Sequence, residues 1–230
     1  MSVRQKVPED LTARKALALE VIDRLKKEYP DAGCTLDYAH AWQLLVSVRL
    51  AAQCTDARVN IVVEDLFAKY PSVAALAAAE PEDIEAIVKP CGLGHSKARD
   101  ISACMRMLRD KYDCQVPATF EELLALPGVG RKSANLIMGD VFGKPAIVTD
   151  THCIRLCNRI GLVDGIKEPQ KVEMALWKII PPEEGSDLCH RFVMHGRAVC
   201  NARKPECEHC CLKAICRYAQ ERSDTQMAGS

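Results

Sequence analysis

The sequence is poor in aromatic side chains and carries no excess of charge. Phe, Trp and Tyr make up 5% of its 230 residues. With Ala and Leu abundant, this composition favours helices over a β-rich fold. Lys plus Arg and Asp plus Glu number 31 each, so the formal net charge is zero. This balance excludes a uniformly basic protein. It leaves two alternatives, a local basic patch that could meet nucleic acid or an evenly charged surface.

Long apolar runs and a signal sequence are also missing. No stretch reaches the roughly 20 apolar residues that a membrane-spanning helix needs. The first residues, MSVRQKVPEDL, are polar and lack an apolar core. Thirteen cysteines is an odd number, which argues against a secreted disulfide framework. We therefore expect a soluble, cytoplasmic protein in a reducing environment, with no membrane partner.

Apolar residues recur with helical spacing along most of the chain, and no segment shows the sustained alternation of a strand. The predicted fold class is therefore all-α. Residues that can cap helix N-termini are present at Thr55, Ser96, Thr119 and Asp150. Thr119 also has Glu122 three residues later, which is typical of a capping box. Helices are expected over about 12–28, 38–55, 57–69, 96–112, 119–126, 131–142, 151–160, 169–179 and 186–198.

Four cysteines near the carboxyl end share a short loop with little apolar content: Cys200, Cys207, Cys210 and Cys216. Their spacing is Cys-x6-Cys-x2-Cys-x5-Cys. Thiolates so clustered suit zinc or an iron–sulfur cluster. Zinc sites usually pair their ligands in two short knuckles and only one is present, so the spacing favours the cluster and keeps zinc as the alternative. Free thiols are disfavoured because clustered, exposed thiols oxidise. Cys211 fits no ligand position.

The tight turn Leu126-Pro127-Gly128-Val129-Gly130 is expected between two helices. Its glycines permit positive φ, and the N–H groups that start the next helix can bind a phosphate. Such a turn also occurs as an ordinary helix connection, but the Arg131-Lys132 pair that follows favours an anion site. In the first helical turn, the dipole disfavours a charged Lys132 and so favours its nucleophilic neutral amine.

Asp150 lies 18 residues beyond Lys132, at an expected helix start. It could serve only as an N-cap, which requires no chemistry. The two roles are compatible, because a capping carboxylate is held rigidly, as a catalytic one should be.

In this order and spacing, the turn through Lys132, the segment Asp150-Thr151-His152 and the cysteine loop resemble the endonuclease III family of helix-hairpin-helix DNA glycosylases. The resemblance runs from the first helix to Cys216. It implies two helical lobes with a DNA-binding cleft between them. One is a six-helix lobe over 34–144, ending in the hairpin at about 119–142. The other combines 1–33 with 145–230 and carries the cluster loop, 200–216. It also implies that the four cysteines hold a 4Fe–4S cluster.

The resemblance implies a bifunctional DNA glycosylase and AP lyase of base excision repair that acts on damaged double-stranded DNA. Lys132 would expel an oxidised pyrimidine, form a Schiff base and nick the strand 3′ to the abasic site by β-elimination. Asp150 would stabilise positive charge on the sugar and keep Lys132 neutral. Gln53 and Leu93 match family residues that enter the duplex. Further DNA contacts are expected at Lys97, Gly128, Val129, Gly130, Arg131, His152, Arg203 and Lys204.

Departures from the family pattern occur at Arg49, at Gly94-His95 and at Met138-Gly139-Asp140, and they put the base preference in doubt. Within the family, adenine-removing relatives are disfavoured because position 47 is Ser rather than Glu and because Lys132 is present. Mismatch-specific relatives tend to lack this lysine, whereas a dimer-cutting relative that keeps it stays an alternative.

Outside the family, the alternative is a DNA-binding module without enzymatic activity. Retention of both Lys132 and Asp150 argues against it. One lesion requires only a monomer, which we expect to be associated with the nucleoid through its DNA.

Overall fold

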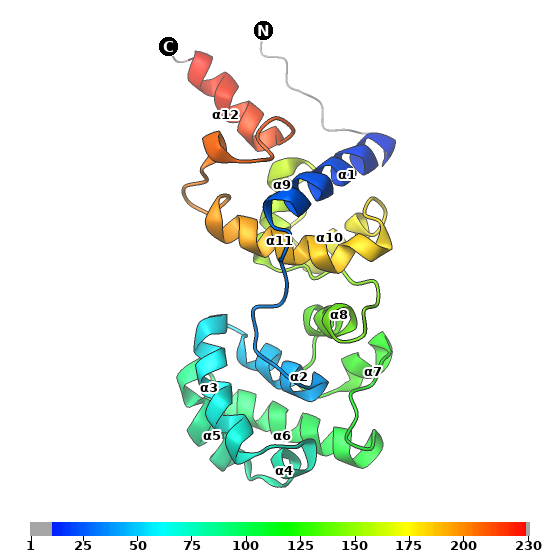
Figure 1. The fold of residues 1–230 in the computed structure, drawn as a ribbon, viewed down its shortest axis with the longest axis vertical. Coiled ribbons are helices and arrows are strands. Elements are labelled where there is room, and N and C mark those ends of the chain that lie inside the picture. Colours follow the sequence, from blue (N-terminus) through cyan, green and yellow to red (C-terminus); the bar gives the residue numbers. More distant parts are fainter. Residues whose placement is uncertain (1–10, 229–230) are drawn as a thin grey trace. The chain divides into compact units, whose positions relative to one another are not determined.

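The computed structural model describes residues 11–228 and contains α-helices and short 3-10 helices, with no strand in that range (Figure 1). The prediction of an all-α fold is confirmed. The polar first residues, MSVRQKVPEDL, fall mainly on positions 1–10, outside the described residues. None of the described helices is both long enough and apolar enough to cross a membrane.

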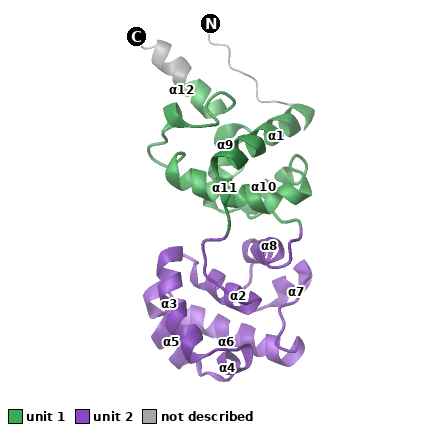
Figure 2. Cartoon of the chain, in the orientation of Figure 1, with its two compact units in different colours: residues 1–33, 145–230 green, residues 34–144 purple. Residues whose placement is uncertain are grey.

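The chain divides into two compact units, coloured separately in Figure 2. We call Cys34–Lys144 the hairpin unit. Met1–Gly33 and Pro145–Ser230 together form the second unit, which we call the cysteine-loop unit. Each unit is described by itself below.

The hairpin unit contains seven α-helices, one more than the six expected. Two of them are short: Ser72 caps one, and Pro81 begins the other. Its centre is α6 (Gly94–Lys111), whose apolar face packs against α4 and α5. The other elements are α2 (Ala41–Leu50), α3 (Asp56–Lys69), α4 (Val73–Ala78), α5 (Pro81–Val88), the 3-10 helix η1 (Lys89–Cys91), α7 (Phe120–Ala125) and α8 (Arg131–Asp140).

The cysteine-loop unit joins the first helix to the carboxy-terminal part of the chain. Ala18, Val21, Ile22 and Leu25 form one buried face of α1 (Leu11–Glu28), which packs against α11. The remaining elements are α9 (Thr151–Ile160), α10 (Pro169–Leu176), η2 (Pro182–Glu184), α11 (Gly185–Ala198), η3 (Cys207–His209) and α12 (Arg217–Ala228).

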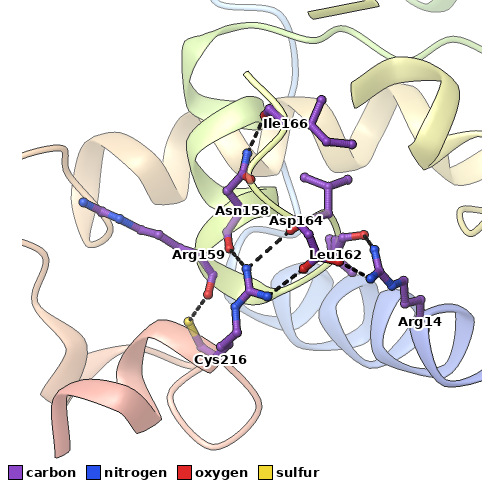
Figure 3. Close-up of polar contacts among 9 residues, drawn as sticks. Arg14, Asn158, Arg159, Leu162, Asp164, Ile166 and Cys216 are labelled. Carbon is purple, nitrogen blue, oxygen red and sulfur yellow. Dashed lines mark hydrogen bonds and ion pairs between the residues drawn. The ribbon is translucent and has the colours of Figure 1, made fainter. Parts of the chain in front are cut away.

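Polar contacts hold distant segments of this unit together around the loop that follows α9 (Figure 3). Asp164 in this loop accepts hydrogen bonds from Arg14 of α1 and, at 2.7 Å, from Arg217 of α12. Burial opposes ionisation of Asp164, but these two guanidinium groups outweigh it and lower the pKa of the carboxyl group. Arg217 also donates to the Asn158 carbonyl at 2.7 Å. Helix α1 is thereby held to the loop after α9, and α12 is held to that loop and to α9 itself.

Three of the four predicted caps are confirmed. Thr55, Thr119 and Asp150 each accept a hydrogen bond from the backbone N–H three residues ahead. The prediction that Ser96 caps a helix is wrong, because α6 begins two residues earlier, at Gly94. Leu93 takes the capping position with a left-handed backbone, at φ 52°, and brings the chain into the helix ahead of the serine.

Gly185 at the start of α11 provides a test of packing in the cysteine-loop unit. A Cβ atom there would lie 2.4 Å from the backbone oxygen of Ala146, which has no side-chain freedom to move away. We expect Gly185→Ala to lower the free energy of unfolding by about 1–3 kcal/mol, as overpacking does. Gly33→Ala is the matched control, because a Cβ at Gly33 meets nothing within 4 Å. Urea denaturation measures both; equal midpoints for Gly185→Ala and the parent would contradict the packing.

Candidate functional site

The glycine turn before α8 packs directly on an ion pair between two other helices. Arg49 of α2 donates to Asp100 of α6 at 2.7 Å. Gly128 has φ 75°, and a Cβ there would lie 2.8 Å from the Asp100 Cβ and 3.1 Å from the Arg49 Cδ. Both the backbone conformation and the close approach therefore require glycine at this position.

The start of α8 is available to an anion. Its N-cap residue is Gly130, which has no side chain to accept from the first N–H groups of the helix. N–H groups at a helix start, together with the positive end of the helix dipole, form a ready site for a phosphate.

Lys132 is the second residue of α8, and its side chain is exposed. Arg131 is partly buried, with its guanidinium carbon 4.9 Å from the centroid of the Phe120 ring. This stacking fixes one of the two neighbouring cations and leaves the other in solvent, where a substrate could reach it.

Gln53 and Leu93 share a backbone conformation that is rare for residues other than glycine. Their φ angles are 57° and 52°, both in the left-handed region. Gln53 is exposed, and Leu93 keeps 58% of its surface accessible. Strained residues with exposed side chains are typical of functional positions, because a packed structure must hold them there. Without the family resemblance, the sequence would favour a helix-end glutamine at position 53 and a packed leucine at position 93.

The prediction that Lys97 contacts DNA is wrong for its side chain. Lys97 is fully buried, and its ammonium group donates to the carbonyls of Leu50 at 2.9 Å and Cys91 at 2.8 Å. Burial lowers the pKa of Lys97. Its neighbours His95 and Ser96 are exposed, whereas Lys97 points into the unit.

Asp150 belongs to the cysteine-loop unit, whereas Lys132 belongs to the hairpin unit. Its carboxylate oxygen Oδ1 accepts from the N–H of Cys153 at 2.7 Å and caps α9. The residue is only partly buried. The cap holds one oxygen to the backbone. Asp150 is thus a carboxylate with a fixed orientation at the positive end of a helix.

His152 is the second residue of α9 and lies beside a second polar side chain. Its Nδ1 atom is 3.1 Å from Arg155 Nη2. Arg155 also donates to the carbonyls of Gly196 and Cys200, each at 3.1 Å. A Cβ at Gly196 would lie 2.5 Å from His152 Nδ1, so the imidazole rests closely on α11.

The four cysteines lie in one electrostatic neighbourhood. Burial raises the pKa of Cys207, and the sulfurs of Cys200 and Cys210 raise it further. Burial likewise raises the pKa of Cys216 to about 11, again with contributions from Cys210 and Cys200. Such thiols ionise when a metal displaces their protons.

Several of these sulfurs are also close to hydrogen-bonding groups. Arg159 donates to the Cys200 sulfur at 3.3 Å, and His195 Nε2 lies 3.3 Å from the Cys210 sulfur. Within residues 11–228, no three His, Cys, Asp or Glu side chains converge where a single metal ion could bind.

Arg203 and Lys204 are exposed in the same loop. The backbone N–H of Lys204 donates to Asn201 Oδ1 at 2.8 Å, which braces the turn beneath both cations. Their side chains are thus free to face an anionic surface.

Arg155 and Arg159 are the structural residues whose role sequence reasoning missed. Arg159 donates to the carbonyls of Asn201 at 2.8 Å and Ala202 at 2.9 Å, in addition to the Cys200 sulfur. Together the two arginines tie α9 to the start of the cysteine loop. Their spacing of four residues, which places them on one helix face, was the available signal.

Comparisons with known proteins agree with this set of features. The family model described as "HhH-GPD superfamily base excision DNA repair protein" matches residues 46–182. Endonuclease III of Synechocystis sp. is 43% identical over 211 residues, covering 91% of this chain and 96% of the relative. Endonuclease III of Escherichia coli K12 is 37% identical over 207 residues, covering 90% and 98%.

A solved structure is similar over the same length. It is a trapped endonuclease III–DNA covalent intermediate, in an estranged-adenine complex. It is 41% identical to this chain and aligns with a TM-score of 0.86, covering 91% of this chain and 98% of its own.

The geometry at Asp150 predicts that its capping role can be separated from its charge. Asp150→Ala removes the acceptor for the Cys153 N–H and should lower the free energy of unfolding by about 1 kcal/mol. Asp150→Asn keeps an acceptor oxygen and should unfold close to the parent. Ser72→Ala, which removes the cap of α4, serves as a matched control for cap loss. Equal destabilisation by the Asn and Ala variants would contradict the capping geometry.

Proposed function

Because the chain belongs to the HhH-GPD superfamily of base excision DNA repair proteins, and within it to the endonuclease III family, we propose that it uses Lys132 and Asp150 to remove oxidised pyrimidines and then cut the strand. It is a DNA glycosylase and AP lyase. The observation that carries the residue assignment is made in each unit separately: the hairpin unit has an exposed lysine in the first turn of α8, and the cysteine-loop unit has a carboxylate fixed at the start of α9.

The first chemical step releases the base. The damaged nucleotide leaves the stack, because its C1′ atom cannot be reached inside the duplex. The neutral Lys132 amine attacks C1′, and the bond between C1′ and the base nitrogen breaks. The departing base keeps the bonding electron pair and takes up a proton. Asp150 stabilises the positive charge that develops on the sugar, because its negative charge is held in place by the cap.

The second step cuts the strand. The ring oxygen leaves C1′ as the sugar opens, which gives a Schiff base between C1′ and Lys132 Nζ. Loss of a proton from C2′ then expels the 3′ phosphate by β-elimination. Hydrolysis of the imine returns the free amine. These steps move protons and electron pairs only and need no redox group.

The DNA contacts are assigned to three groups of residues. The uncapped N–H groups after the Gly128-Val129-Gly130 turn would hold a backbone phosphate, with Arg131 beside them. Gln53 and Leu93 would occupy the space of the extruded nucleotide. Backbone contacts in the second unit would come from His152, Arg203 and Lys204.

Cys200, Cys207, Cys210 and Cys216 would hold a 4Fe–4S cluster. The spacing supports this assignment over zinc. Zinc sites usually take their sulfur ligands in two short pairs, and only the pair Cys207 and Cys210 has that spacing. When bound, the cluster supplies structure to the loop that presents Arg203 and Lys204.

The partner would be damaged double-stranded DNA, and the enzyme would act as a monomer on the chromosome. One lesion is processed by one lysine, so the chemistry needs no second copy.

Trapping with borohydride tests the lysine. Reduction of the Schiff base should give a covalent adduct between the parent enzyme and a thymine-glycol duplex, and Lys132→Ala should abolish it. Lys111→Ala is the control, because Lys111 is an exposed lysine of the same unit outside the hairpin.

We expect Asp150→Asn to slow base release by about 10²-fold or more, as loss of a charge-stabilising group does. An undiminished adduct from Lys132→Ala would reject Lys132 as the nucleophile. No adduct from the parent enzyme would favour the alternative of a DNA-binding module without enzymatic activity.

Metal analysis tests the cluster. The purified protein should be brown and contain iron and acid-labile sulfide, and Cys207→Ala should lose both. Cys211→Ala should keep both, because Cys211 is assigned no ligand role. DNA affinity of Cys207→Ala should fall as the loop loosens around Arg203 and Lys204. A colourless parent protein that contains zinc would refute the assignment.

A further inference from the structure

Lys97 is the most deeply buried cation in the part of the chain that the structure describes. It is the fourth residue of α6, and its side chain has no accessible surface. A buried ammonium group is costly unless hydrogen bonds and opposing charge or dipoles compensate. A position near the start of a helix adds to this cost, because the helix dipole is unfavourable to a cation there. Packing alone would be better served by an apolar side chain.

The compensation comes from the ends of two other helices. Leu50 is the last residue of α2, and Cys91 is the last residue of η1. Carbonyl groups at helix ends lack intrahelical partners and carry partial negative charge. Lys97 donates to both, at 2.9 Å and 2.8 Å. One ammonium group therefore joins the C-terminal ends of two separate elements.

Each of these elements leads directly into one of the two left-handed residues. Gln53 lies three residues after Leu50, and Leu93 lies two residues after Cys91. Both have positive φ and exposed side chains. Since a non-glycine residue in this region is strained, the segments before it must be fixed for the conformation to persist.

We propose that Lys97 is a positioning residue that holds Gln53 and Leu93 in register with each other, so that both enter the duplex together when a nucleotide is extruded. This rests on the roles proposed above for those two side chains. Lys97 itself touches no DNA. Its contribution is to make two loops, 40 residues apart in sequence, behave as one rigid device.

A second polar link extends the same device to the hairpin. Arg49, next to Leu50, donates to Asp100 at 2.7 Å and to Ser96 at 3.2 Å. Gly128 packs on this ion pair. The loops of Gln53 and Leu93 and the proposed phosphate-binding turn thus all rest on the junction between α2 and α6.

The test compares two substrates with Lys97→Met, which keeps an unbranched four-atom apolar side chain and removes the charged Nζ with its N–H donors. The first substrate is a thymine-glycol duplex, in which the nucleotide must be extruded. The second is a single-stranded oligonucleotide with a preformed abasic site, in which it need not be. Because extrusion costs least from a single strand, we expect base release from the duplex to fall about tenfold or more, and borohydride trapping on the single strand to stay within about twofold.

A mutant cycle separates positioning from general destabilisation. If Lys97 acts through Leu93, the loss caused by Lys97→Met should largely disappear in a Leu93→Ala background, because residues that act as one unit are not additive. Leu108→Ala is the matched control, since Leu108 is fully buried on the same helix, remote from both loops in sequence. Lys97→Gln, which keeps N–H donors, carries the same comparison should Lys97→Met not fold.

The outcomes are distinct. A loss confined to the duplex and absent in the Leu93→Ala background supports the proposal. Equal losses on both substrates, additive losses in the cycle, or the same selective loss from Leu108→Ala would overturn it. Failure of the parent enzyme to form an adduct on either substrate would instead overturn the proposed function, and the role of Lys97 with it.

Discussion

An α-helix leaves N–H groups unpaired over its first turn and carbonyl groups unpaired over its last. In a protein built from helices, side chains must satisfy these groups wherever water is excluded. Here charged side chains do so beside the candidate site. Asp150 caps the start of α9, and Lys97 donates hydrogen bonds to the last carbonyl groups of α2 and η1. The groups that satisfy helix ends therefore also fix the backbone from which the site residues extend.

This arrangement explains how a chain with zero net charge can suit a polyanion. Lys132 is the second residue of α8, and Leu93 directly precedes α6. Both are at helix starts, which carry unpaired N–H groups and the positive ends of helix dipoles. A few such ends supply local positive potential without an excess of Lys and Arg. Net charge was a poor guide to DNA binding because it adds up the charges of the whole chain. The positive potential at these helix starts is local and does not enter that sum.

Local features of the fold could be predicted from the sequence, and non-local ones could not. The caps at Thr55, Thr119 and Asp150 were predicted because each involves a hydrogen bond across three residues. The prediction of a cap at Ser96 was wrong because no neighbouring residue in the sequence indicates a left-handed backbone at Leu93.

Lys97 shows the limit most clearly for the candidate site. In the segment Gly94-His95-Ser96-Lys97 it has the pattern of an exposed helix start, and its partner Leu50 is 47 residues away. A buried lysine cannot be told from a phosphate-binding one without knowing which carbonyls the fold brings to it. By contrast, the spacing of the four cysteines alone was enough to predict them as candidate metal ligands.

The cysteine loop and α9 depend on each other unequally. Cys153, Leu156, Cys157 and Ile160 bury one face of α9, so this helix is held by apolar packing whatever the loop does. The loop itself buries little besides Leu212 and Cys216. Its other attachments are polar and include the bonds from Arg155 and Arg159, the bond from Arg24 to the Cys211 carbonyl and the contact between His195 and the Cys210 sulfur. The proposed cluster would add its own. Too little apolar area is buried to offset the entropy of ordering such a segment. Loss of the cluster would thus free Arg203 and Lys204 first, while the cap at Asp150, formed within α9, would persist. A group that takes no part in bond-making can in this way be needed for DNA binding and yet be dispensable for the geometry of the carboxylate.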